Sequence, residues 1–238
     1  MQDNERLFSK INVVTYLTYT FNSFKVAKFC SNYLNYELID VHNLDLTRPI
    51  NNIILVFPIH SEDAPNIIKE VVSKINSKRM IIIATFGRIN HGNVIYRLKY
   101  KLNLPLVGAS YFPTKHSYLK EDKFIPKYEL LIPLLNKINS DKYIDIPNEK
   151  STLGYNIFPK LRARLGIKII KKDKCNNCNI CGDNCFNNAI NNGIINKNCI
   201  RCLRCISLCP SNNLDYKMNK VLRLYLRKQS KNKPFIYL

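Results

Sequence analysis

The sequence predicts an open α/β domain with a parallel sheet, followed by a small α+β domain organised around cysteines. Two observations carry this prediction. Short apolar runs alternate with helical patterns from Ile11 to about Ser140, and eight of the nine cysteines lie between residues 175 and 209. At 238 residues with 46% hydrophobic content, the chain can bury a sizeable core. Its longest apolar runs, Ile53 to Ile59 and Met80 to Ala84, are far below the roughly 18 residues of a membrane span, so we expect no transmembrane segment.

Strands and helices alternate along the first domain. Apolar runs predict strands over Ile11–Leu17, Ile53–Phe57, Met80–Thr85 and Leu104–Tyr111, and helical patterns predict helices over Ser23–Leu34, Pro65–Ile75, Asn93–Leu102 and Pro126–Ile138. Strands joined by helices of about ten residues imply right-handed crossovers and a parallel sheet covered on both faces. Ligands of such sheets lie beyond the carboxyl ends of the strands. Three loops are expected there, at Thr18 to Ser23, Pro58 to Ala64 and Gly87 to Asn93.

The cysteines repeat one spacing, C-x2-C-x2-C-x3-C, with a period of 24 residues. The two copies are Cys175, Cys178, Cys181, Cys185 and Cys199, Cys202, Cys205, Cys209. This spacing is typical of ligands to 4Fe-4S clusters, in which three thiolates bind one cluster and the fourth binds the other. We therefore expect one cluster on Cys175, Cys178, Cys181 and Cys209, and a second on Cys199, Cys202, Cys205 and Cys185.

Two other uses of the cysteines fit less well. A zinc site on Cys175, Cys178, Cys199 and Cys202 would leave four regularly spaced cysteines without a role. A secreted disulfide scaffold does not suit so long a chain, whose first ten residues lack the apolar core of a signal peptide. We expect a cytoplasmic protein. The ninth cysteine, Cys30, lies on the apolar face of a predicted helix and is expected to be a core thiol.

The first loop, Thr18-Tyr-Thr-Phe-Asn-Ser23, runs from a strand directly into a helix and offers hydroxyls, an amide and a helix N-terminus. These groups bind phosphate. Candidate ligand-binding residues in the three loops are Thr18, Thr20, Asn22, Ser23, Pro58, Gly87, Gly92 and Asn93. The four histidines are scattered along the chain, so each is expected in a loop or at the surface. No Ser-His-Asp, paired-carboxylate or Walker pattern indicates an enzyme.

The order of these motifs, together with Phe57-Pro58 at a strand end, resembles the flavodoxin-ferredoxin fusion proteins of anaerobic bacteria, over about residues 11 to 216. The resemblance implies a flavodoxin-like domain that binds FMN and a two-cluster ferredoxin-like domain. In that family the first loop carries two glycines, which are replaced here by Tyr19 and Phe21. At positive φ each replacement would cost roughly 1 to 2 kcal/mol. The loop therefore predicts weak or substoichiometric FMN binding.

A second departure lies beside the cysteines. The family usually has a proline after the last cysteine of each copy. Pro210 keeps it, whereas Phe186 replaces it in the first copy. We interpret Phe186 as a change that tunes the site rather than abolishing it.

We expect four segments: the flavodoxin-like domain at 1–145, a basic linker at 146–171, the ferredoxin-like domain at 172–216 and a basic tail at 217–238. The formal charge is +20, and bases are concentrated in Lys160 to Lys174 and Lys217 to Lys233. Such a field attracts an acidic redox protein, nucleic acid or an anionic membrane surface. Single-electron transfer through two clusters is the function that these features favour. A nucleic-acid-binding or redox-sensing module with structural clusters is the alternative.

Overall fold

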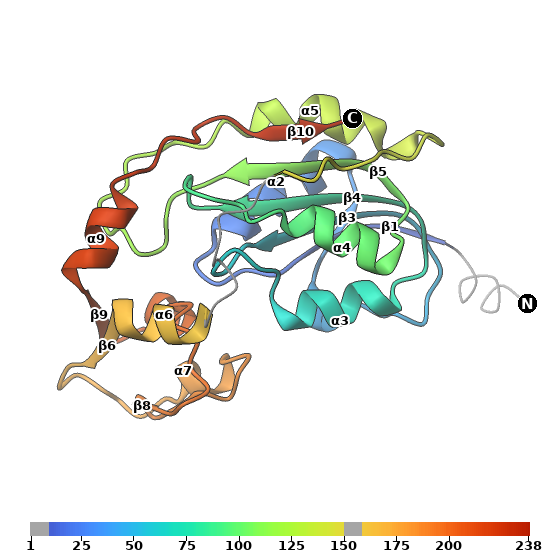
Figure 1. Ribbon diagram of the computed structural model, residues 1–238. Helices are drawn as coiled ribbons and strands as arrows, with labels where there is room; N and C mark the ends of the chain where they lie inside the picture. The colour runs from blue at the N-terminus through green and yellow to red at the C-terminus, as the bar shows by residue number, and fades with distance from the viewer. Residues whose placement is uncertain (1–9, 150–158) are drawn as a thin grey trace, which may run out of the picture.

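The structure is a computed structural model that describes residues 10–149 and 159–238. Its first part is a six-stranded sheet in the order β2-β1-β3-β4-β5-β10 (Figure 1). The strands are β1 (Ile11–Tyr16), β2 (Glu37–Asp40), β3 (Ile50–Pro58), β4 (Ser77–Phe86), β5 (Leu106–Pro113) and β10 (Phe235–Tyr237). The first five are parallel and β10 is antiparallel to β5. The order 2-1-3-4-5 is that of flavodoxin-like doubly wound folds.

Helices cover both faces of this sheet, as the alternating pattern predicts. One face packs on α3 (Asn66–Lys74) and α4 (Val94–Leu102). The other packs on α2 (Asn22–Leu34) and on three short turns, η2 (Tyr128–Leu131), α5 (Ile132–Leu135) and η3 (Asn136–Asn139). A further turn, η1 (Val41–Asn43), follows β2. β3 and β4 are buried on both faces over most of their length, which explains the apolar runs Ile53–Phe57 and Met80–Ala84 within them.

Two elements of this domain differ from the sequence prediction. Pro126–Ile138 is not one helix but three short turns, with Pro133 at the start of the middle one, where its missing N–H is tolerated. β2 was not predicted, because its four residues are polar at both ends and lie at the sheet edge, next to β1. Cys30 is fully buried, as expected of a core thiol.

The cysteine-rich part consists of short elements: α6 (Pro159–Gly166), β6 (Ile167–Lys171), α7 (Ile180–Asp183), β7 (Ile190–Asn191), β8 (Ile194–Ile195), α8 (Arg204–Leu208) and β9 (Leu214–Met218). β6 pairs antiparallel with β9, and β7 with β8. Figure 1 shows this part beside the carboxyl ends of the parallel strands. The ranges proposed as linker and tail are therefore structured where they are described. The linker range contains α6 and β6, although its residues 150–158 lie outside the described residues.

The C-terminal segment returns to the first domain. After α9 (Lys220–Leu226) the chain crosses to the sheet edge, where Phe235 of β10 pairs with Tyr111 of β5. Arg88 anchors the crossing: its guanidinium donates to Asp122 at 2.6 Å and to Gln229 at 2.6 Å, and its carbonyl accepts from the N–H of Lys231. No described helix is long and apolar enough to cross a membrane.

Candidate functional site

The backbone of the cysteine-rich part repeats with the same 24-residue period as the sequence. Left-handed residues occur at Asn177, Asn179 and Asn188 and again at Arg201, Leu203 and Asn212. α7 and α8 begin 24 residues apart, at Ile180 and Arg204. Asparagine adopts this conformation readily, whereas arginine and leucine do so at a cost. The same turns are thus formed in both copies, although only the first copy has favourable residues throughout.

The turns arrange the eight cysteines around two small cavities. One, which we call the inner cysteine site, is lined by Cys185, Cys199, Cys202 and Cys205. The other, the outer cysteine site, is lined by Cys175, Cys178, Cys181 and Cys209. Each site therefore combines three cysteines of one copy with the last cysteine of the other. In the described part of the chain no three His, Cys, Asp or Glu side chains converge closely enough to hold a single metal ion.

The last cysteine of each copy accepts an equivalent hydrogen bond. The N–H of Ala189 donates to Cys185 Sγ at 3.3 Å, and the N–H of Asn213 donates to Cys209 Sγ at 3.3 Å. Both donors lie four residues after the sulfur that they contact. At the outer site, burial by itself would raise the pKa of Cys209. Hydrogen bonds from Ser211 and from backbone N–H groups outweigh burial and hold this pKa below its ordinary value. At the inner site, burial raises the pKa of Cys202 and of Cys205 to about 12.

The two cysteine sites differ in their surroundings. Cys178 of the outer site is exposed, and the lining of that site comes entirely from the cysteine-rich part. The inner site lies against the sheet domain, where Phe186, Ile200 and Cys202 pack on the core. Arg204 makes the central contact between the two parts. Its Nη1 donates to the carbonyl of Thr18 at 2.7 Å, and its guanidinium lies 4.3 Å from the centre of the Phe186 ring.

Phe186, the residue that replaces proline, lies in an aromatic stack. It contacts the guanidinium of Arg204, and it stacks on His42 with ring centres 4.3 Å apart. Tyr118 adds a second contact between the two parts, because its hydroxyl donates to the carbonyl of Arg201 at 2.8 Å. A proline ring has no aromatic face to offer to the guanidinium and the imidazole. Phe186 therefore serves the contact between the two domains.

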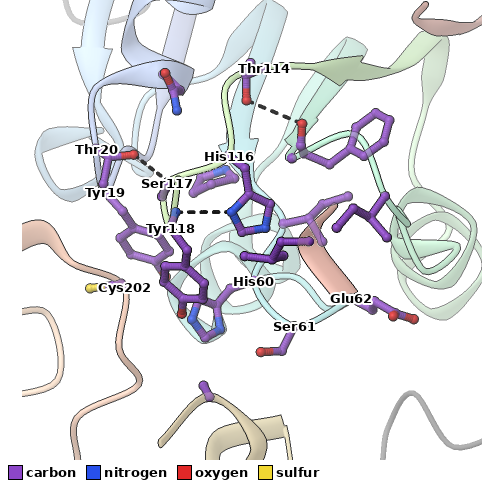
Figure 2. A pocket seen from close by; sticks show the side chains of 18 of the residues that line it. Tyr19, Thr20, His60, Ser61, Glu62, Thr114, His116, Ser117, Tyr118 and Cys202 are labelled. Carbon is purple, nitrogen blue, oxygen red and sulfur yellow. Dashed lines mark hydrogen bonds between the residues drawn. The ribbon is translucent and has the colours of Figure 1, made fainter. Parts of the chain in front are cut away.

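A much larger cavity, of about 610 Å³, lies at the carboxyl ends of the parallel strands. We call it the sheet-end cavity. Of the residues predicted to bind a ligand, it is lined by Thr18, Thr20, Asn22, Ser23, Pro58 and Gly87. Figure 2 shows Tyr19, His60, Tyr118 and Cys202 together at one side of it. Because Cys202 also lines the inner cysteine site, the two cavities share a wall.

Two predicted ligand-binding residues do not line this cavity. Gly92 has a φ of +61° and lies against the Glu62 backbone, so it serves a tight turn. Asn93 is buried and donates from its side chain to Asn148 and Glu149. Both residues thus shape the entry into α4. They lie apart from the cavity because the turn carries the loop away from the strand ends before the helix begins.

The first loop is tied down by its own polar groups. Thr20 Oγ1 lies 2.7 Å from Ser117 Oγ, Asn22 donates to the carbonyl of Lys115 at 3.0 Å, and Ser23 Oγ lies 2.8 Å from Thr85 Oγ1. Thr18 Oγ1 differs, because it is buried and has no hydrogen-bond partner among the described residues. A buried hydroxyl of this kind is normally satisfied. The Thr18 hydroxyl thus lacks the partner that such a buried group normally has, and Thr18 lines the sheet-end cavity.

Only one of the two glycine replacements is strained. Phe21 has a φ of +62°, whereas Tyr19 is absent from the left-handed positions of the described chain. Phe21 is also one of the more exposed aromatic residues, and Tyr19 is buried at the cavity wall. The predicted cost of two strained residues is thus halved, to roughly 1 to 2 kcal/mol.

Sequence reasoning missed half of the cavity wall. The loop after β5 contributes Thr114, Lys115, His116, Ser117 and Tyr118, and α6 and α9 contribute apolar side chains. Burial lowers the pKa of His60 and of His116 to about 4, so both imidazoles are neutral near neutral pH. The loop after β5 could have been included in the predicted site, because it follows a strand that the sequence predicts. Nothing in the sequence indicated that α6 and α9 would reach the cavity.

His91 differs from the expectation for histidines. It is buried, and its ring stacks on Tyr111 with centres 3.8 Å apart. Burial lowers its pKa to about 4, although Glu149 lies 3.2 Å from its Nε2. It is a core residue and lines neither the sheet-end cavity nor the cysteine sites.

Comparison with known proteins gives likenesses to solved structures and no match in sequence. No family model matches the chain, and no curated protein matches it. Among solved structures, the chain is similar to a flavodoxin from the domain Archaea, with 12% sequence identity and a TM-score of 0.30, over 47% of this chain and 87% of that one. The class that fold and geometry define is an α/β protein of flavodoxin-like strand order with eight cysteines in two groups of four.

Proposed function

We propose that the chain is an iron-sulfur electron-transfer protein that holds one 4Fe-4S cluster in each cysteine site. The observation that carries this proposal is the grouping of the cysteines, three from one copy and one from the other, around each of two cavities. Such clusters, when bound, accept and release single electrons. The chain's part is to supply four thiolates per site, to exclude water from the inner site and to hold the two sites beside each other.

The donor geometry fits a cluster better than a single ion. A zinc ion needs four ligands that converge to about 2.3 Å from one point, whereas each thiolate around a four-iron cluster binds a different iron. The cysteines surround their cavities without converging, and none of the described groups suits a single ion. The backbone N–H groups directed at Cys185 and Cys209 also fit, because hydrogen bonds to sulfur tune such clusters.

Anaerobic purification with iron and sulfide measured together tests this proposal. The expected content is about eight irons and about eight sulfides per chain, with an EPR signal after reduction by dithionite. Cys30→Ala is the control, since this cysteine lies outside both sites and its replacement should leave the iron content unchanged. Zinc in place of iron, or iron without sulfide, would contradict the proposal.

We also propose that the sheet-end cavity binds FMN, with its phosphate at the loop from Thr18 to Ser23. The free hydroxyl of Thr18, the start of α2 and the nearby Lys115 suit an anion. The volume of the cavity is in the range that holds cofactors. The chemistry that FMN would supply is exchange between one-electron and two-electron steps. Because Phe21 and the closed loop hinder the approach of a phosphate, the expected binding is weak.

Flavin titration followed by fluorescence quenching tests the FMN site. Thr18→Val removes the unpartnered hydroxyl and is expected to weaken binding roughly fivefold to tenfold, since one hydrogen bond contributes about 1 kcal/mol. Thr47→Val is the matched control, because the Thr47 hydroxyl donates to Asp45 and Thr47 lines none of the three cavities described above. No saturable binding of added FMN would remove the flavin from the proposal and leave the clusters untouched.

An acidic redox protein is the partner that we propose for the outer cysteine site. Cys178 is exposed there, and Lys171, Lys172 and Lys174 are exposed in the chain that leads into the site. Attraction between oppositely charged surfaces speeds the association of two proteins, and salt screens this attraction. Electron transfer to an acidic acceptor should therefore slow as ionic strength rises. Binding of nucleic acid that is independent of cluster reduction would favour the alternative function.

A further inference from the structure

Two helices of the C-terminal half expose large apolar side chains. On α6, Leu161 is 48% exposed and Leu165 is 69% exposed. On α9, Val221, Leu224 and Tyr225 are 76%, 58% and 43% exposed. We call these five residues the apolar ridge. Their spacing of three and four residues places them along one side of each helix.

The two helices meet at their ends. The N–H of Asn219, which precedes α9, donates to the carbonyl of Gly166 at 3.0 Å, and its side chain donates to the carbonyl of Leu165 at 2.9 Å. Leu165, Val221 and Tyr225 all line the mouth of the sheet-end cavity. Three of the five ridge residues therefore meet at the edge of that opening, and Leu161 and Leu224 extend the ridge along α6 and α9. Scattered exposed apolar residues are ordinary, but a contiguous set rimmed by charge marks an interaction surface.

The charged residues on and directly after the two helices are basic. Arg164 lies on α6 and Lys168 follows that helix, whereas Lys220 and Arg223 lie on α9 and Arg227 and Lys228 follow it. The structure shows none of these six in an ion pair within its described residues. No acidic residue occurs from Lys217 to the end of the sequence. Arg164 donates to the carbonyl of Cys199 at 3.1 Å, but no acidic side chain of the described residues neutralises any of the six bases, so their charge is available to something outside the fold.

We propose that the apolar ridge docks on the surface of an anionic lipid bilayer. Protruding leucine, valine and tyrosine side chains with a basic rim suit insertion between lipid headgroups, where apolar burial and attraction to anionic lipids act together. A protein partner would instead require an acidic groove of matching shape. The seven residues of α9 are far too few to span the bilayer, so the chain lies on the surface. Docking places the mouth of the sheet-end cavity against the lipid.

Co-sedimentation of the full chain with vesicles tests this proposal. Binding is expected to vesicles that contain equal amounts of phosphatidylcholine and phosphatidylglycerol, and not to phosphatidylcholine alone. Since each base near such a surface contributes about 1 kcal/mol, Arg223→Gln with Arg227→Gln should weaken binding roughly 25-fold. The control is Lys25→Gln with Lys28→Gln, which removes the same charge from exposed positions on α2. Equal losses in the two pairs would show that diffuse charge, and not the ridge, drives binding and would overturn the proposal.

Insertion of the ridge can be followed separately. The chain contains no tryptophan, so Val221→Trp reports on the ridge alone. Its emission should shift to the blue with anionic vesicles, whereas that of Lys25→Trp should not. Leu224→Ser should weaken vesicle binding. If poly-glutamate binds as tightly as the vesicles and Leu224→Ser changes neither, the surface recognises acidic polymers and the lipid proposal is wrong.

Discussion

Arg204 holds the cysteine-rich part on the sheet domain, and its replacement gives a measurable loss of stability. It donates to Thr18 across the two parts at 2.7 Å and to the carbonyl of Asn184 at 3.1 Å, and it covers the Phe186 ring. A hydrogen bond from a charged donor contributes about 1.5 to 3 kcal/mol, and a cation over a ring about 0.5 to 2 kcal/mol. The bond to Thr18, which crosses the boundary, and the contact with the Phe186 ring together contribute about 3 kcal/mol.

Arg204→Ala should therefore lower the unfolding midpoint by roughly 6 to 12 °C, at 2 to 4 °C per kcal/mol for a chain of this size. Calorimetry of anaerobically purified protein is the assay. Arg204→Lys keeps the charge but cannot make both bonds while lying flat on the ring, so we expect an intermediate midpoint. Arg223→Ala is the control, because this arginine is exposed on α9. A midpoint for Arg204→Ala equal to that of the control would refute the reasoning.

Three further predictions concern the sheet domain. Gly87→Ala should destabilise the chain by about 1 to 3 kcal/mol in urea unfolding, because an added Cβ would clash with the His116 ring; an unchanged midpoint would contradict this contact. Phe21→Gly should stabilise it by up to about 1 kcal/mol, as relief of the left-handed conformation outweighs the added chain entropy, and a loss of stability would show that the Phe21 ring packs usefully. Stability should fall as the pH drops from about 6.5 toward 4, by about 1.4 kcal/mol per pH unit for buried His91, because the unfolded chain takes up a proton that the folded chain resists. His91→Phe keeps the stacking and should reduce that slope in urea titrations at several pH values, whereas an unchanged slope would assign it to other groups.

The central strands of the sheet could be predicted because each is marked by an apolar run in its own sequence. Runs such as Ile53 to Phe57 are apolar on both faces and can be recognised without their neighbours. β2 and β10 were not predicted from the sequence. An edge strand is paired on one side and is covered less, so its sequence need not be apolar. β10 also ends a basic segment, and only its pairing with β5 makes it a strand.

The sequence predicts those parts of the site that a single segment of the chain forms. The cysteine spacing is fixed by short turns, so the two groups of four could be expected from the sequence. The contact of Arg204 with Thr18, and the shared wall at Cys202, join residues more than 180 positions apart in the chain. Such contacts depend on how two folded parts pack together, which no local pattern records.

The central claim is that each cluster is bound by three cysteines of one copy and the last cysteine of the other. The iron content of double variants tests this claim most directly. Cys178→Ser with Cys209→Ser removes two cysteines from the outer site only, so about four irons should remain. Cys178→Ser with Cys185→Ser removes one cysteine from each site, and the iron content should fall toward zero. If the second pair instead kept about four irons and the first pair lost them all, each cluster would be bound within one sequence copy and the account would be contradicted.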